Sequence, residues 1–152
     1  MKTKDRVQAH TARHVNEEIA TEAERRVLRA AGLGDAAISR HIRDLEEEWD
    51  IERWLEANAA ALAFTGVMLG LFVNKKFLAI PCFVLPFLFQ HAVQGWCPPV
   101  PMFRRFGIRT RREIDAEKYA LKGLRGDFDL LPRAHNGATI DRARRAWQAA
   151  NS

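Results

Sequence analysis

The sequence predicts an all-α fold in which two apolar helices form a membrane-spanning hairpin between amphipathic helices. Two acid-free apolar stretches, residues 57–73 and 77–94, follow one another with only a short polar turn between them. Nearly all charged residues lie outside these stretches, and both flanks repeat apolar residues at helical spacing. We therefore expect a cytoplasmic helix pair over residues 1–52, a transmembrane hairpin over residues 53–97 and basic interfacial helices over residues 98–152.

The two apolar stretches have the length of membrane spans. They contain seventeen and eighteen residues, and at ~1.5 Å per helical residue each reaches roughly 25 to 27 Å, close to the ~30 Å hydrocarbon core of a bilayer. A buried helical hairpin of a soluble protein is the alternative, because short apolar stretches alone do not separate the two.

Tryptophans and basic residues favour the membrane. Trp54 lies 21 residues before Lys75 and Trp96 lies 21 residues after it, so an antiparallel hairpin places both indoles at one depth as interface anchors. Ten Lys and Arg residues lie before Trp54 and twelve lie after Trp96, against two in the turn. Since Lys and Arg concentrate on the cytoplasmic side of a membrane, we expect both termini in the cytoplasm.

Two amphipathic helices are expected before the hairpin, on either side of the glycine-containing stretch AAGLGD. Their apolar stripes are formed by Val15, Ile19, Ala23 and Val27 in the first helix, and by Ile38, Ile42, Leu45 and Trp49 in the second. An antiparallel pair and an intermolecular coiled coil both fit. His10 and His14, with Glu17 or Glu18, have spacing that can hold zinc on one helix face, but a solvated face is the simpler interpretation and no metal site is predicted.

A basic helix is expected after the hairpin, over residues 111–125. Thr110 and Glu113 have the T-x-x-E spacing of a capping box, and Gly126 suits a C-terminal cap. A nucleic-acid partner is not expected, because no aromatic stacking platform accompanies the basic residues. The arginines predicted to lie along anionic lipid headgroups are Arg104, Arg105, Arg109, Arg111 and Arg112. A further basic amphipathic helix is expected near the C-terminus, with an apolar side formed by Ile140, Ala143 and Trp147.

Small residues recur on one face of the first span. They are Ala59, Ala63, Gly66 and Gly70, and the two glycines form a G-x-x-x-G pattern. Such a face lets two helices approach closely, and the partner helix is either the second span or the same helix of another protomer. The pattern therefore predicts tight helix packing and leaves homodimerisation open.

Polar residues inside the spans predict a second contact. Mirroring the chain about Lys75 brings Asn58 within one position of His91. We expect these two residues, with Gln94, to form a polar cluster beneath the cytoplasmic interface. A structural role is favoured over a proton relay, because the spans offer no acidic partner at depth.

Cys97 permits two interpretations. Gly95 and three nearby prolines suit the end of a helix, with Cys97 packed as a small apolar residue. The alternative is a reactive thiol whose pKa is lowered by neighbouring arginines. Anion-cradle catalysis is disfavoured, because Pro98 and Pro99 remove backbone donors that such a loop needs.

The stretch from Gly95 to Pro98, Gly-Trp-Cys-Pro, is followed by Gly107-Ile108 and preceded by an apolar hairpin. In these features the chain, over about residues 51–110, resembles the transmembrane domain of membrane sulfurtransferases of the YgaP type. That resemblance implies a bacterial inner-membrane hairpin, often dimeric, without an established reaction. The chain departs from those proteins because it lacks a rhodanese domain and adds helices before the hairpin, so the resemblance gives sulfur chemistry no further support.

No nucleotide-binding or hydrolase signature occurs in the sequence. We therefore expect a non-enzymatic membrane anchor or accessory subunit that has no cofactor and that holds a protein partner or a second copy of itself. The hypothesis from another class is a thiol, redox or sulfur-transfer protein acting through Cys97 at the cytoplasmic interface.

Overall fold

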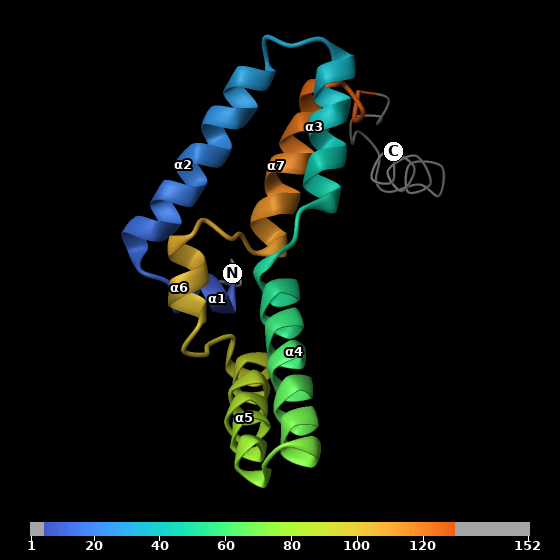
Figure 1. The fold of residues 1–152 in the computed structure, drawn as a ribbon. Coiled ribbons are helices and arrows are strands. Elements are labelled where there is room, and N and C mark those ends of the chain that lie inside the picture. The colour runs from blue at the N-terminus through green and yellow to red at the C-terminus, as the bar shows by residue number, and fades with distance from the viewer. Residues whose placement is uncertain (1–4, 130–152) are drawn as a thin grey trace, which may run out of the picture. The chain divides into compact units, whose positions relative to one another are not determined.

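The computed structural model describes residues 5–129, and within them the chain forms helices and no strand, which confirms the predicted all-α class. Figure 1 shows the arrangement. The elements are α1 (Arg6–Ala9), α2 (Arg13–Ala30), α3 (Asp35–Glu47), α4 (Ile51–Phe72), the 3₁₀ helix η1 (Lys75–Leu78), α5 (Ala79–Gln94), α6 (Val100–Arg105) and α7 (Arg111–Leu124). The basic helix expected around Ile140, Ala143 and Trp147 lies outside the described residues.

Two compact units make up the chain, and each is assembled from separate stretches of sequence. Within the described residues, the first unit contains residues 5–22 and 48–114, and the second contains residues 23–47 and 115–129. These units do not follow the three consecutive segments expected from the sequence. Each unit combines chain from before and after the hairpin, because amphipathic stripes on both flanks find partners across it.

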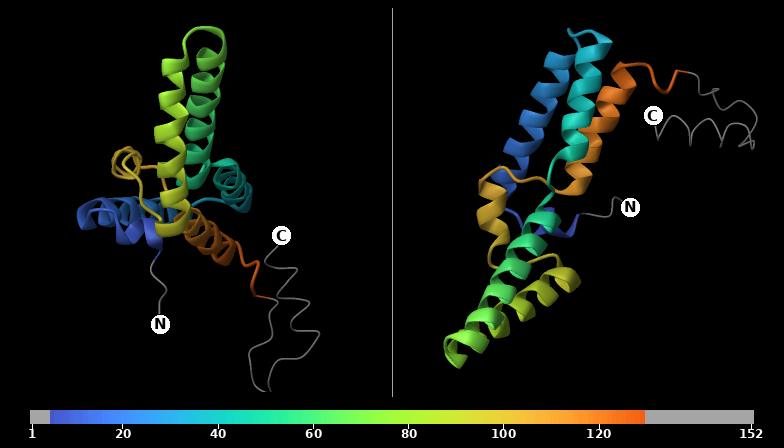
Figure 2. Two further views of the ribbon diagram at one scale, coloured as in Figure 1. Left: turned by 90° about the horizontal axis from the view of Figure 1, so that it is seen from below. Right: turned by 45° about the vertical axis from the view of Figure 1, so that its right-hand side comes forward.

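The hairpin of α4 and α5 belongs wholly to the first unit, and its two helices lie side by side in Figure 1 and Figure 2. The side chain of Asp50 caps α4 by accepting a hydrogen bond of 2.9 Å from the Arg53 amide. At the turn, the Asn74 side chain accepts one of 2.9 Å from the Lys76 amide. Both caps satisfy amides that a helix leaves without partners.

The small residues of α4 are used inside this hairpin. A Cβ added at Gly66 would lie 2.6 Å from Cδ of Pro81, and one at Gly70 would lie 2.6 Å from a side-chain carbon of Leu78. Ala59 and Ala63 are half-buried on the same face. The predicted close approach is therefore confirmed, and its partner helix is the second arm of the same chain.

Two helices are long and apolar enough to cross a membrane. In the first helix, which ends at Phe72, only 17% of the most apolar stretch is buried within the protein. In the second helix, which ends at Gln94, the buried share of the corresponding stretch is 11%. A core helix of a soluble protein is mostly buried. Most of this apolar surface therefore faces outward.

Gly95 ends α5 and turns the chain toward α6. Its φ of 72° is in the left-handed region that favours glycine, and its amide donates to the His91 carbonyl at 2.7 Å. A Cβ here would also clash with Arg6 of α1. Pro99 is the N-cap residue of α6. The GWCPP stretch therefore ends α5, as predicted, and is followed directly by a short helix that was not predicted.

In the second unit, α3 and α7 lie side by side in Figure 1 and Figure 2. The predicted stripe of α3 is buried at Ile38, Ile42 and Leu45. The prediction that Trp49 is the fourth member of this stripe is wrong, because α3 ends at Glu47 and the Trp49 side chain is 40% exposed.

The end of α7 matches the predicted glycine cap. Gly126 has a φ of 84°, and its amide donates to the Gly123 carbonyl at 3.2 Å. The Asp127 amide donates to the Lys122 carbonyl at 3.1 Å. This pair of bonds is a Schellman motif, which satisfies the last carbonyls of the helix.

Candidate functional site

The apolar core of the first unit lies where α4 begins and α5 ends. Its buried members are Val7, Ile51, Leu55, Cys97 and Val100. Phe103 and Ile108 pack against this cluster, and the Ile51 amide donates to the Arg109 carbonyl at 2.8 Å. We call this cluster, with the polar side chains around it, the hairpin base.

Cys97 belongs to this core. The residue is 3% exposed, and burial raises the pKa of its thiol, an effect that a hydrogen bond from the Val100 backbone opposes and the charge of Glu52 reinforces. A reactive thiolate needs a lowered pKa. The packing agrees with the interpretation of Cys97 as a small apolar residue, and the geometry does not favour sulfur transfer through it.

His91 pairs with Glu52 at the base. Its Nε2 lies 2.6 Å from Oε2 of Glu52, and the imidazole is 4% exposed. The predicted cluster of Asn58, His91 and Gln94 is therefore wrong. Asn58 instead donates from Nδ2 to the Trp54 carbonyl at 2.8 Å on the exposed surface, and Gln94 is also exposed.

The contacts between the arms show why the mirror count failed. Gly66 packs against Ile80 and Pro81, and Gly70 packs against Leu78, so the arms mirror about residues 73 and 74 and not about Lys75. This shift moves the position opposite His91 about three residues toward the start of α4. Glu52 lies about one helical turn further along the same helix, and its long side chain reaches His91.

Arg104 of α6 is the most buried charged residue of the base, with 1% exposure. Its guanidinium donates to both carboxylate oxygens of Glu113, at 2.6 and 2.7 Å. It also donates to Asn16 Oδ1 at 2.8 Å and to the Ile108 carbonyl at 3.1 Å. Arg104 thus joins α6 to the start of α7 and to α2.

Glu113 is the acceptor at the centre of this network. It receives hydrogen bonds from Gln8 at 2.7 Å and from the Thr110 amide at 2.8 Å, so the predicted capping box is confirmed. Burial alone would raise the pKa of Glu113. The hydrogen bonds from Arg104, Thr110 and Gln8 outweigh burial and lower this pKa below 4.5.

The predicted row of lipid-facing arginines divides into two groups. Arg109 is 5% exposed and makes a two-pronged ion pair with Glu48, whose Oε1 lies 2.8 Å from Nε of Arg109. Lipid contact is therefore wrong for Arg104 and Arg109, because both guanidinium groups are buried and paired with the carboxylates of Glu113 and Glu48. The arginines that are exposed, as a headgroup contact requires, are Arg105, Arg111 and Arg112.

Arg6 ties α1 to the end of the second arm. Its Nη1 donates to the carbonyls of Ala92 at 3.0 Å and Val93 at 3.1 Å. These carbonyls belong to the last turn of α5, where no intrahelical donor remains. No periodic pattern predicts this contact, because Arg6 and Ala92 are 86 residues apart.

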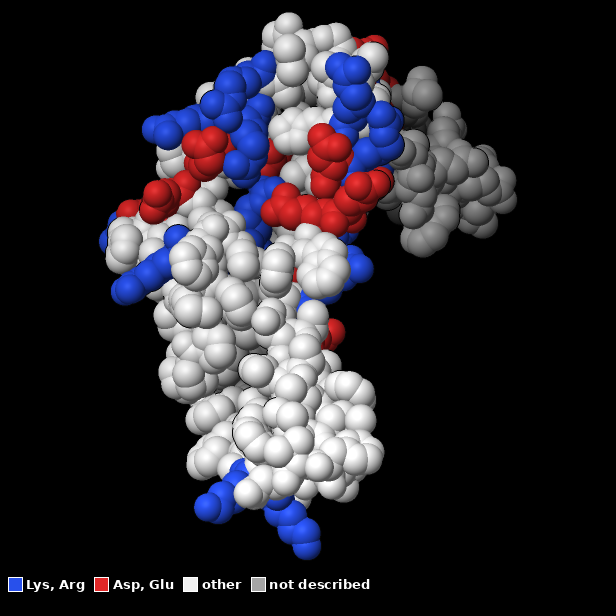
Figure 3. Space-filling view, in the orientation of Figure 1, with Lys and Arg blue, Asp and Glu red and all other residues white. Residues whose placement is uncertain are grey.

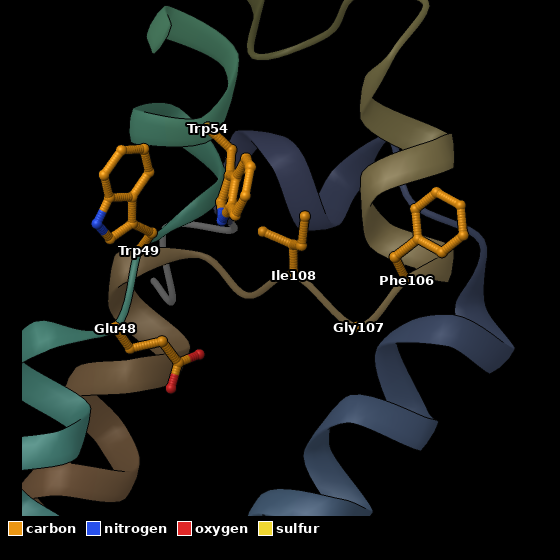
Figure 4. Close-up of a pocket in the computed structure, with 6 residues that line it drawn as sticks. All are labelled: Glu48, Trp49, Trp54, Phe106, Gly107 and Ile108. Carbon is orange, nitrogen blue, oxygen red and sulfur yellow. The ribbon is translucent and has the colours of Figure 1, made fainter. Parts of the chain in front are cut away.

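Aromatic side chains border the base. The Trp49 and Trp54 ring centroids lie 5.4 Å apart, and Trp54 also contacts Phe103 at 6.5 Å. Trp54 is 40% exposed and Trp96 is half-buried, so both predicted anchors retain accessible surface. A groove beside them, shown in Figure 4, is lined by Glu48, Trp49, Trp54, Phe106, Gly107 and Ile108.

His10 and His14 do not share a helix. α1 ends at Ala9 and α2 begins at Arg13, so His10 lies in the turn, with Nδ1 2.8 Å from the Arg6 carbonyl oxygen. The i, i+4 spacing therefore does not place the two rings on one face. Residues 5–129 contain no group of three or more His, Cys, Asp or Glu side chains that could hold a metal ion.

The second unit has a polar centre of its own at Glu117 of α7. This carboxylate accepts two hydrogen bonds of 2.9 Å from Arg26 of α2 and lies 3.2 Å from Nε2 of His41 of α3. Arg125 donates to Ser39 at 2.8 Å. Glu117 was not predicted as a buried centre, because a single acidic residue on a helix of mixed polarity has the pattern of a solvated side chain.

No protein-family model, curated protein or solved structure matches the chain.

Proposed function

We propose that this protein is a membrane anchor whose hairpin inserts into the bacterial inner membrane and whose flanking helices hold a partner at the cytoplasmic surface. The supporting observation is the apolar arm, residues 57–94 of the hairpin. Phe64, Leu71 and Phe83 are each more than 60% exposed on it. Figure 3 shows the arm as white surface with basic residues at its tip. A patch of this size on a soluble surface marks an interaction site.

The distribution of charge supports insertion with both termini in the cytoplasm. Within the arm, Lys75 and Lys76 at the turn are the only Lys, Arg, Asp or Glu residues. Twenty-two Lys and Arg residues lie outside the arm against these two, and the positive-inside rule places the richer side in the cytoplasm. The resemblance to the transmembrane domain of membrane sulfurtransferases of the YgaP type supports a bacterial inner membrane.

The accessory role rests on the parts outside the arm. Exposed Leu28, Leu33 and Tyr119 give the second unit apolar surface for a protein partner. The small-residue face of α4 is occupied by α5, so a homodimer would use another surface. Burial of Cys97 makes its thiol inaccessible as a nucleophile, which favours the anchor over a thiol reaction through this residue.

Two matched arginine substitutions test insertion. Phe64 in α4 and Leu28 in α2 are equally exposed, at 67% and 65%. Phe64→Arg puts a charge in the span at about 2.5 to 3.5 kcal/mol and should release the protein from membranes washed with alkaline carbonate, whereas Leu28→Arg should leave it bound. Equal membrane retention of both variants, or carbonate extraction of the unaltered protein, contradicts the anchor. Purification in mild detergent then identifies the partner.

A further inference from the structure

We propose that the aromatic groove, formed by Glu48, Trp49, Trp54, Phe106, Gly107 and Ile108, binds one anionic phospholipid of the cytoplasmic leaflet. Its acyl chain lies along the aromatic side chains and its phosphate pairs with Arg53. This inference rests on the proposed membrane insertion, since it gives the inserted protein a defined lipid site at the level where the hairpin leaves the bilayer.

The lining suits a hydrocarbon chain. Figure 4 shows Trp49, Trp54, Ile108 and Phe106 in a row across one face of the hairpin base, with Gly107 between the last two. The groove has a volume of about 450 Å³, within the ~300 to 1,000 Å³ of small-molecule sites. A Cβ at Gly107 would meet nothing within 4 Å, so this wall of the groove is open.

Backbone pairing favours a lipid over a peptide. The amides of Phe106, Gly107 and Ile108 donate to carbonyls of α6, and the Ile108 carbonyl accepts from Arg104. A peptide laid in the groove would bury its own amides against these occupied groups, which is costly. An acyl chain carries no such groups.

The position of Trp54 places the groove at the membrane boundary. Trp54 is in the first turn of α4, and the apolar arm begins three residues later at Ala57. Tryptophans at this level of a span sit among headgroups and upper acyl chains. Trp54 therefore gives the groove a wall at the start of the lipid-facing arm, where lipid is the molecule present at high concentration.

The charges around the groove complement a phosphate. Glu48 is paired with Arg109, so its carboxylate is compensated. Glu52 and Glu56 stand two residues on either side of Trp54, roughly 200° around the helix, on the opposite face. The Arg53 guanidinium lies 4.3 Å from the Trp49 ring centroid, and this stacking holds a cation beside the indoles.

A fluorescence titration tests the site. The double variant Trp96→Phe, Trp147→Phe leaves the two groove tryptophans as the only indoles, since the chain has four. The protein in mild detergent is titrated with phosphatidylglycerol brominated on its acyl chain, which quenches indoles on contact. Quenching should saturate near one lipid per chain.

Two substitutions in this background separate the acyl and phosphate contacts. Phe106→Ala should raise the half-saturating lipid concentration about tenfold, because the contact between this ring and the bound acyl chain is lost. Phe106 is 74% exposed, so its removal spares the fold. Arg53→Gln should keep the quenching and abolish the preference for phosphatidylglycerol over phosphatidylcholine. Met102→Ala, on α6 outside the groove, is the matched control and should change neither.

Quenching that rises without saturation, or that Phe106→Ala leaves unchanged, overturns the lipid site. If quenching by the brominated lipid decreases as the protein concentration rises, a second copy of the protein occupies the groove. That result would also overturn the lipid site. Neither result affects the carbonate extraction that tests the anchor. Carbonate release of the unaltered protein, by contrast, would contradict the proposed anchor function, whatever the result of the lipid titration.

Discussion

The exposed residues of α4 change character between its first two turns and the rest of the helix. Near the hairpin base the exposed side chains include Glu52, Arg53 and Glu56, whereas along the arm they include Leu62 and Phe64. The interior changes in the opposite sense. The base encloses ion pairs among apolar residues, while the arm packs small residues of α4 against α5 and, apart from His91 near its end, has no buried ionisable side chain. One helix therefore carries surfaces suited to two solvents.

Different interactions hold the base and the arm together. At the base, paired charges fix the positions of α1, α6 and the start of α7. In the arm, no hydrophobic driving force between helices exists once lipid surrounds them, so close packing at glycine must supply the contact. Substitutions should therefore act through electrostatics in one region and through steric fit in the other.

The largest effect is expected from Arg104→Met. This change leaves Glu113 buried without its cationic partner and should destabilise the protein by about 3 to 5 kcal/mol. The exposed neighbour Arg105 is the control, and Arg105→Met should change stability by less than about 0.5 kcal/mol. Thermal unfolding in detergent measures both. Equal melting temperatures for the two variants would show that the buried network does not hold the base.

Gly66→Val should have the next largest effect, in the arm. Even the Cβ would lie 2.6 Å from Pro81 and 2.8 Å from Ile80, so α4 and α5 must separate, at about 1 to 3 kcal/mol. Ala61→Val, on the exposed face of the same helix, is the matched control. Cysteine cross-linking between the arms should weaken only in the Gly66 variant. Unchanged cross-linking would contradict the packing.

Substitutions of Glu52 and His91 should destabilise the protein by removing the same contact. Because their side chains form one contact, the double variant Glu52→Gln, His91→Leu should cost little more than the worse single variant. Asn58→Leu is the control, and its effect should add to that of His91→Leu because the two residues do not meet. If the losses of stability from the Glu52 and His91 substitutions are additive, the two side chains do not contact each other.

Acidification should weaken the base through Glu113. Its pKa is lowered in the folded state, so its contribution to stability is complete above the ordinary value of 4.5 and is lost as the pH falls through the folded pKa. Glu113→Gln should flatten this part of the stability profile. Urea unfolding between about pH 6 and pH 3 measures it, and an identical pH slope in both proteins would contradict the assignment.

The smallest effect is expected at Cys97. Burial raises the pKa of its thiol, so a charged maleimide should label it slowly at neutral pH, and Cys97→Ala should leave membrane insertion unchanged. Exposed Cys82 is inside the proposed span and should also resist a charged reagent. Rapid labelling of Cys97 below pH 7 would instead favour the thiol-transfer hypothesis.

Local sequence patterns predicted the helices and their ends well. They predicted contacts between distant residues poorly. The capping box at Thr110, the glycine ends at Gly95 and Gly126 and the close approach at Gly66 depend on neighbouring residues or on one helix face, so they can be found in a sequence. The Arg104 network depends on Gln8 and Asn16, which the fold brings from almost a hundred residues away. The same is true of Arg6, while the Glu52 pair depends on where the two arms mirror each other, which the sequence does not show.

The most direct measurement of the central claim is the sidedness of the turn. Alkaline phosphatase is active only outside the cytoplasm, so a fusion after Lys76 should be active while fusions at either terminus should be inactive. A matched fusion after Gly34, between α2 and α3, should also be inactive. Activity at the termini with none after Lys76 would reverse the orientation, and inactivity at all four positions would contradict a membrane-spanning hairpin.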